Sequence, residues 1–185
     1  MFKFKFKEIN FLSGTFIEIK KQFDKGGVLV APAASALIDI SKNKDYYKAL
    51  KNADIAILDS GFFCILLRVF KQYKVIKLSG FLFLRRFLFN FKKNKKIFLV
   101  NPSIKENKTN SKYLRNLGIR NFESYISPIY KNIEDKRLIK KINKFKPHYI
   151  MINLGGGIQE ILGVYIKNNI KFKSSIMCTG AAIAF

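Results

Sequence analysis

The sequence predicts an α/β fold, a Rossmann-like and mostly parallel β-sheet with helices on both faces. Short apolar runs alternate with amphipathic stretches along the whole chain, which is the pattern of strand–helix–strand units. The apolar runs are continuous rather than alternating, as expected for strands that are buried on both faces. With 185 residues, of which 49% are hydrophobic, we expect a single domain over residues 1–185.

The expected elements follow this alternation in order. Residues 1–12 alternate apolar residues with Lys at a period of two, which predicts an edge strand and not a signal peptide. Apolar runs rich in Val, Ile, Phe and Tyr predict further strands at residues 28–30, 55–58, 75–78, 97–100, 122–125, 149–153 and 174–177. Amphipathic stretches predict helices at residues 14–23, 35–40, 45–51, 62–71, 81–91, 105–117, 133–145 and 159–168.

The composition is strongly basic. Lys and Arg number 35 against 12 for Asp and Glu, a formal net charge of +23, which favours an anionic partner such as nucleic acid, an anionic bilayer or a phosphorylated substrate. Lys, Asn, Ile and Phe are also the residues that an A+T-rich genome encodes in excess, so the charge alone names no partner. No apolar run reaches the roughly 18 residues that crossing a bilayer requires, so we expect any membrane association to be peripheral.

Residues 81–96 (FLFLRRFLFNFKKNKK) combine aromatic and basic side chains. One interpretation is an interfacial helix on an anionic membrane. The other, which we favour, is a deeply packed helix whose Lys-rich end complements the helix dipole. The aromatic residues have helical spacing and not the spacing of a strand platform, so we expect no nucleic-acid partner.

The cysteines and the histidine indicate no metal site. Cys64 and Cys178 lie far apart in apolar surroundings, which predicts two buried thiols and no disulfide. His148 is the sole histidine and lies at the entrance of an expected strand, away from the edge where ligands bind. We therefore expect neither a metal nor another cofactor.

Small, polar and glycine residues follow most of the expected strands. Asp59 comes directly after the apolar run Ile-Ala-Ile-Leu, where a carboxylate could act as a general base or cap the following helix. The segment Asn-Leu-Gly-Gly-Gly-Ile-Gln-Glu ends at Glu160, and its glycines could bring backbone N–H groups against a diphosphate or simply make a tight turn. Lys77 could pair with a phosphate oxygen or be an ordinary exposed lysine.

Five segments, taken in order, resemble the WecG/TagA/CpsF glycosyltransferase family (glycosyltransferase family 26). They are VLVAPAASAL, ADIAILDSG, IKLSG, KPHYIMINLGGGIQE and MCTGAAIAF. The second resembles the family's "adlvlpDG" segment, the third its "eRvsG" segment and the fourth its "pDillvglG-P-kQE" segment. The resemblance runs through most of the chain.

The resemblance implies a bacterial enzyme that transfers an N-acetylhexosamine- or hexose-type sugar, with inversion and without a metal, from a UDP-sugar to a polyprenyl-diphosphate-linked acceptor. The pathway implied is surface polysaccharide or teichoic-acid-type biosynthesis, in the cytoplasm at the inner face of the cytoplasmic membrane. The partners implied are the UDP-sugar, the lipid-linked acceptor and an anionic membrane surface; a homo-oligomer stays open.

The family's proposed base maps to Asp59, and its Gln-Glu pair maps to Gln159 and Glu160 near the nucleotide-sugar. The Arg of "eRvsG" is replaced by Lys77, which keeps the charge but loses the bidentate geometry. The expected substrate-binding residues are Gly61, Lys77, Ser79, Gly80, Gly155, Gly156, Gln159, Glu160 and Gly180.

Several positions depart from the family's pattern. Ala31 and Ala33 stand where the family has Thr and Asn, Leu82 stands where it has Asp, and Gly157 replaces a Pro. After the expected strand at residues 97–100 the family has a Gly-rich turn, whereas this sequence has Asn-Pro-Ser at residues 101–103. Relatives continue past the position of Phe185 into a basic segment, so we expect a diverged member that is shortened at the C-terminus. The alternative function is a catalytically inactive remnant that binds a nucleotide-sugar or a partner protein.

Overall fold

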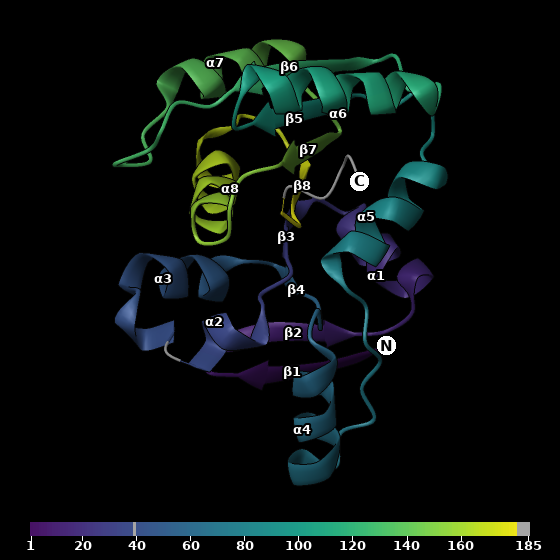
Figure 1. The fold of residues 1–185 in the computed structure, drawn as a ribbon, viewed down its shortest axis with the longest axis vertical. Helices are drawn as coiled ribbons and strands as arrows, with labels where there is room; N and C mark the ends of the chain where they lie inside the picture. The colour runs from purple at the N-terminus through teal and green to yellow at the C-terminus, as the bar shows by residue number, and fades with distance from the viewer. Residues whose placement is uncertain (39, 181–185) are drawn as a thin grey trace.

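The computed structural model describes residues 1–38 and 40–180 (Figure 1). One eight-stranded sheet runs through them in the order β1-β2-β4-β3-β8-β7-β5-β6. The strands are β1 (Phe2–Phe6), β2 (Ile9–Ser13), β3 (Gly27–Val30), β4 (Ile55–Ala56), β5 (Ile97–Asn101), β6 (Phe122–Ile126), β7 (Tyr149–Ile152) and β8 (Ser175–Cys178). Only β1 and β2 pair antiparallel, and the other neighbours pair parallel. The predicted α/β, mostly parallel, Rossmann-like fold is confirmed.

Helices cover both faces of this sheet, with α3 and α8 on one side and α1 and α5 on the other (Figure 1). The helices are α1 (Phe16–Phe23), α2 (Ala34–Ile38), the 3-10 helix η1 (Ile40–Lys42), α3 (Lys44–Asn52), α4 (Gly61–Lys71), α5 (Gly80–Phe89), α6 (Ile104–Asn116), α7 (Lys136–Phe145) and α8 (Ile158–Asn169). The strands from β2 onward contribute side chains to both cores, because successive side chains point to opposite faces. The edge strand β1 contributes to one core only and exposes Lys3 and Lys5. In β3, Val28 and Val30 join one core, and Leu29 joins the other.

The first twelve residues form a hairpin rather than a single strand. β1 lies at the edge of the sheet as predicted, and its register with β2 runs from the Phe2–Ser13 pair to the Phe6–Ile9 pair. The turn consists of Lys7 and Glu8, which have φ angles of 46° and 57°. Two-residue hairpin turns of this hand usually carry Asn or Gly, so the sequence held no turn signal here.

The strand predicted at residues 75–78 is wrong. This segment is irregular, and its contacts are single hydrogen bonds rather than a ladder. Ile76 N–H donates to Oγ of Ser13 at 2.7 Å, and Leu78 N–H donates to the Leu58 carbonyl at 3.1 Å. The apolar residues Val75 and Leu78 are buried, which explains the strand-like pattern. Their burial needs no strand pairing, because Val75 joins the core that contains α3 and α8 and Leu78 joins the core that contains α1 and α5.

The favoured interpretation of residues 81–96 is confirmed for the helical part. α5 buries Phe83, Leu84, Phe87 and Leu88 against the sheet and ends before the lysines begin. Both cysteines are free and buried, as predicted. Among residues 1–38 and 40–180, no helix has the length and apolar composition needed to cross a bilayer.

Candidate active site

A cavity of about 580 Å³ lies at the carboxyl ends of the parallel strands. The loops after β3, β4, β7 and β8 contribute to its wall, together with the segment that leads into α3. The residues that line it are Ala31, Ala33, Ser35, Ala36, Ile40, Asn43, Tyr46, Asp59, Gly156, Gly157, Gln159, Glu160, Thr179 and Gly180. This is the edge of an open parallel sheet at which ligands bind.

Asp59 lies in this wall, half-buried, between β4 and α4. Its Oδ1 accepts a hydrogen bond of 2.8 Å from the backbone N–H of Gly80, the first residue of α5. The carboxylate therefore faces the positive end of the α5 dipole. The interpretation of Asp59 as the cap of the following helix is wrong, because Ser60 caps α4 by accepting from the N–H of Phe63.

The glycine turn before α8, residues 155–157, forms another part of the cavity wall. Gly157 has a φ of +90°, a conformation that favours glycine, and its N–H donates to Oε2 of Glu160 at 2.7 Å. Gly155 and Gly156 are outside the positive-φ region, and no described heavy atom lies within 4 Å of where their Cβ atoms would be. Neither backbone strain nor packing among the described residues requires glycine at these two positions, which leaves the turn open to close approach by a ligand.

Gln159 and Glu160 are buried beneath this turn and hold it to the end of β8. The Gln159 amide donates through Nε2 to Oε1 of Glu160 at 3.0 Å and accepts through Oε1 from the N–H of Gly180 at 2.8 Å. Burial raises the pKa of the Glu160 carboxyl, against the opposing effect of its hydrogen-bond donors. Burial and the nearby Glu160 charge raise the pKa of Tyr46 as well.

The structure brings together five of the sequence-predicted residues in the cavity wall: Asp59, Gly156, Gln159, Glu160 and Gly180. The remaining predicted residues, Gly61, Lys77, Ser79, Gly80 and Gly155, lie outside the set that lines it.

The five predicted residues outside the lining belong to the turns and helix starts next to the cavity. Gly80 is tightly packed, since a Cβ there would lie 2.9 Å from Cβ of Ala31. Ser79 caps α5 by accepting from the N–H of Leu82 at 3.2 Å. Lys77 is exposed, and its Nζ lies 3.7 Å from where a Cβ of Gly61 would be, beside the start of α4.

Sequence reasoning missed Asn43 and Tyr46, which reach the cavity from the N-terminal end of α3. The only signal for Asn43 was its identity as a good helix-capping residue, a role that it fills by accepting from the N–H of Tyr46 at 3.1 Å. Ala31 and Ala33 do line the wall, so the two departures from the family's first loop fall at the site itself. Of the segment that follows Gly180, Ala181 and Ala182 lie outside the described residues.

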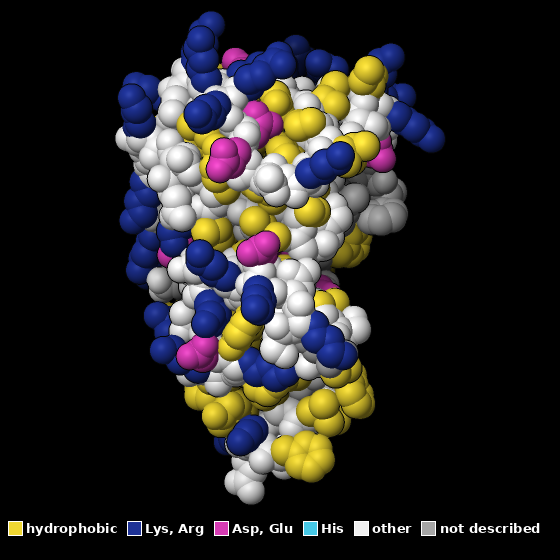
Figure 2. Space-filling view, turned by 90° about the vertical axis from the view of Figure 1, so that its left-hand side faces the viewer, with side chains coloured by type: hydrophobic (Ala, Val, Ile, Leu, Met, Phe, Trp, Pro, Cys, Tyr) yellow, Lys and Arg dark blue, Asp and Glu magenta, His cyan; other side chains and the backbone are white. Residues whose placement is uncertain are grey.

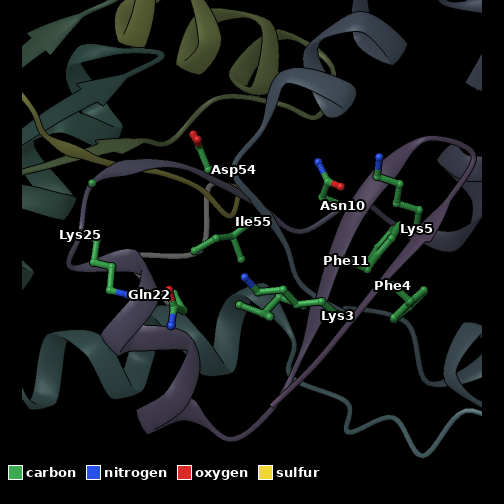
Figure 3. Close-up of a pocket in the computed structure, with 11 residues that line it drawn as sticks. Lys3, Phe4, Lys5, Asn10, Phe11, Gln22, Lys25, Asp54 and Ile55 are labelled. Atoms are coloured by element: carbon green, nitrogen blue, oxygen red, sulfur yellow. Dashed lines mark hydrogen bonds between the residues drawn. The ribbon is translucent and has the colours of Figure 1, made fainter.

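A second cavity of about 550 Å³ lies at the amino ends of β3 and β4, beside the β1–β2 hairpin (Figure 3). Its lining includes Lys3 and Lys5 of β1, Gln22 and Lys25 near the end of α1, and Asp54 just before β4 (Figure 3). Gly26, just before β3, also lines it. The Asp54 carboxylate already accepts from the N–H of Val28 at 2.7 Å and pairs with Lys167 at 2.8 Å. This acidic group is committed to structure, so the cavity at the carboxyl edge is the better candidate.

The described residues contain no group of three or more His, Cys, Asp and Glu side chains that could hold a metal ion. His148 lies at the start of β7, where its Nδ1 accepts from the N–H of Lys96 at 3.1 Å. Burial and the neighbouring Lys95 and Lys96 lower its pKa.

A mostly parallel sheet with a cavity at the carboxyl ends of its strands is the architecture of Rossmann-like α/β proteins, a class in which ligands bind at this place. The model of the WecG/TagA/CpsF glycosyl transferase family matches residues 2–185. The chain belongs to this family, whose members are glycosyltransferases of cell-surface polysaccharide biosynthesis. A search among curated proteins finds no match to the chain.

Proposed function

We propose that the protein is an inverting, metal-independent glycosyltransferase that uses a UDP-sugar as donor and a polyprenyl-diphosphate-linked sugar as acceptor. The transferred sugar is of the N-acetylhexosamine or hexose type. The observation that carries the proposal is that Asp59 lines the same cavity as Gly156, Gln159 and Glu160. A base for the acceptor and a glycine turn for the donor diphosphate then face one volume.

In the proposed reaction the acceptor hydroxyl oxygen attacks the anomeric carbon of the donor sugar. Asp59 takes the hydroxyl proton, and the bond from the anomeric carbon to the diphosphate oxygen breaks with its electron pair leaving on UDP. Attack opposite to the leaving group inverts the anomeric configuration. The hydrogen bond from Gly80 keeps the carboxylate of Asp59 oriented and leaves Oδ2 to receive the proton.

The departing UDP gains negative charge, which backbone N–H groups at Gly156 and at the start of α8 can stabilise. Lys77 is the one cation among the residues predicted from the sequence, and its Nζ lies beside Gly61, where α4 begins two residues after Asp59. The net charge of +23 supports work at an anionic surface, the inner face of the cytoplasmic membrane, where a lipid-linked acceptor resides.

The test is a transfer assay with the purified chain, a panel of UDP-hexoses and UDP-N-acetylhexosamines, and polyprenyl-diphosphate-linked sugar acceptors. We expect UDP release coupled to a lipid-linked product whose new glycosidic bond has the anomeric configuration opposite to that of the donor. A product with retained configuration, or no product with any donor and acceptor, would contradict the proposal.

One observation favours a second candidate, a catalytically inactive member that binds a nucleotide-sugar or a partner protein. Ala31 and Ala33 line the cavity where the family pattern carries Thr and Asn, so the wall lacks two hydrogen-bonding side chains. Calorimetric binding of UDP without transfer to any lipid-linked acceptor would select this candidate over the first.

A further inference from the structure

The outer face of α4 is apolar although it faces solvent. The exposed fractions of its side chains are 66% for Phe62, 55% for Ile65, 66% for Val69 and 75% for Phe70. Their spacing of i, i+3, i+7 and i+8 places them along one side of the helix. We refer to these four residues as the α4 patch.

The α4 patch is separate from the side of the helix that holds the fold together. Phe63, Cys64 and Leu67 are buried, and the Phe63 ring packs against Phe6 and Phe11 of the hairpin at 5.0 and 5.7 Å between ring centroids. The hairpin therefore anchors one side of α4 and leaves the other exposed. Figure 1 shows α4 projecting past β1 at the lower end of the molecule.

The surroundings of the α4 patch are basic. Between Asp59 and Glu106 the sequence contains no Asp or Glu. Arg68, Lys71 and Lys74 are exposed on α4 and just after it. Figure 2 shows hydrophobic side chains gathered at the lower end of the molecule, where Figure 1 places α4, with Lys and Arg side chains above them.

We infer that α4 is a membrane-docking helix, which inserts the α4 patch into the interface of an anionic lipid bilayer. An apolar stripe bordered by Lys and Arg is the composition of helices that lie in the plane of such an interface. If two copies of this chain met through the patch, their Lys and Arg side chains would repel one another, because this segment has no carboxylates to pair with them. The anionic headgroups of a bilayer would instead neutralise this positive charge.

The position of α4 links this docking to the candidate active site. The helix begins at Gly61, two residues after Asp59, and with 11 residues it is about 16 Å long. A bilayer that holds α4 therefore holds the Asp59 end of the cavity close to the headgroup layer, where a diphosphate-linked acceptor presents its sugar. This consequence rests on the proposed function, while the docking itself rests on α4 alone.

The test compares two triple variants of the full chain with the wild type in sedimentation with vesicles. The first is Phe62→Gln, Val69→Gln, Phe70→Gln, which keeps good helix formers on α4. The control is Ile17→Gln, Ile104→Gln, Ile129→Gln, which removes three exposed apolar side chains of 76%, 63% and 97% exposure from other elements at the same net charge. The vesicles are phosphatidylglycerol-rich or purely phosphatidylcholine.

We expect the wild type and the control to bind the phosphatidylglycerol-rich vesicles and the α4 variant to lose at least about 100-fold in partition coefficient, because three large apolar side chains no longer insert. A second variant, Lys71→Gln with Lys74→Gln, leaves the apolar face intact and should lose on the order of tenfold. Circular dichroism and thermal unfolding establish that every variant is folded.

Three results would overturn the inference. The first is that the α4 variant binds the anionic vesicles as well as the wild type does. The second is that the wild type does not bind anionic vesicles. The third is that the wild type binds the phosphatidylcholine vesicles as well as it binds the phosphatidylglycerol-rich ones. A wild-type dimer in analytical ultracentrifugation that the α4 variant alone converts to a monomer, with vesicle binding unchanged, would instead assign the patch to a second copy of the chain.

Transfer assays separate this inference from the proposed function. The α4 variant should keep its rate with a detergent-solubilised or water-soluble acceptor and lose at least about tenfold with the same acceptor group carried in vesicles. A wild type that binds vesicles but transfers no sugar to either acceptor would contradict the proposed function and leave the docking intact. Equal losses with both acceptors would contradict the link between α4 and acceptor delivery.

Discussion

The backbone N–H of Gly80 donates a 2.8 Å hydrogen bond to Oδ1 of Asp59, and this contact joins the beginnings of α4 and α5. One carboxylate oxygen is thereby used to fix the orientation of the side chain. Because an amide oxygen can accept the same hydrogen bond, the contact allows the chemistry of Asp59 to be tested separately from its place in the fold.

We expect Asp59→Asn to lower the transfer rate by about 10²–10⁴-fold, since Asn accepts from Gly80 but cannot take a proton. Calorimetry should find UDP-sugar affinity within about threefold of the wild type, because the glycine turn is untouched. The control is Asp45→Asn, on the exposed first turn of α3, which should leave the rate unchanged. Full activity of Asp59→Asn would remove Asp59 as the base.

The tight packing of Gly80 gives a prediction about stability. A Cβ at this position would lie 2.9 Å from Cβ of Ala31 and 3.3 Å from Cβ of Thr179, so Gly80→Ala must push strand ends apart. We expect a loss of about 1–3 kcal/mol in the free energy of unfolding, measured with urea.

The matched control for this substitution is Gly155→Ala, where the new methyl group would meet open space among the described residues. Its free energy of unfolding should stay within about 1 kcal/mol of the wild type. Equal effects of the two substitutions would show that the close approach at Gly80 does not limit stability.

A substitution at Gly156 should change ligand binding without changing stability. It lines the cavity, has no backbone conformation that demands glycine, and has open space at its Cβ position. We expect Gly156→Ala to unfold at the wild-type urea concentration but to bind UDP on the order of tenfold more weakly, because the methyl group stands where a diphosphate would approach the backbone. Unchanged UDP affinity in calorimetry would argue against this turn as the donor site.

The parallel strands at the centre of the sheet were predictable because strands that are buried on both faces consist of consecutive apolar residues. The run at residues 97–100, for example, lies within β5, whose five residues are all buried. The hairpin turn was not predictable, because Lys7 and Glu8 adopt positive φ angles without the residues that usually do so. Residues 75–78 show the converse error, since an apolar run can be buried without a neighbouring strand to pair with.

The candidate site was predictable where it follows strand ends and not where it depends on packing. Asp59 and Gln159 follow apolar runs, so their common edge was readable. Tyr46 enters the wall only because α3 packs against α8, a long-range contact that local sequence does not encode. The α4 patch was equally hidden, because apolar residues surround that helix and periodicity alone does not say which side the sheet covers.

The buried carboxyl of Glu160 makes stability depend on pH in a defined direction. Burial raises its pKa above the ordinary value of 4.5, so the folded state binds this proton more tightly than the unfolded state. The resulting stabilisation is fully present below pH 4.5 and is lost as the pH rises through the folded pKa. Urea unfolding from pH 4.5 upward should therefore show Glu160→Gln gaining stability relative to the wild type.

The control with the opposite sign is Glu18→Gln. Its contacts with the N-terminal ammonium group and Thr15 lower the pKa of Glu18 to about 2, so its contribution is present above pH 4.5 and is lost as the pH falls toward 2. Relative to the wild type, Glu18→Gln should lose stability as the pH rises from about 2 to 4.5, the reverse of the trend at Glu160. A constant difference between Glu160→Gln and the wild type across the series would mean that the cavity leaves this carboxyl as easily ionised in the folded protein as in the unfolded chain.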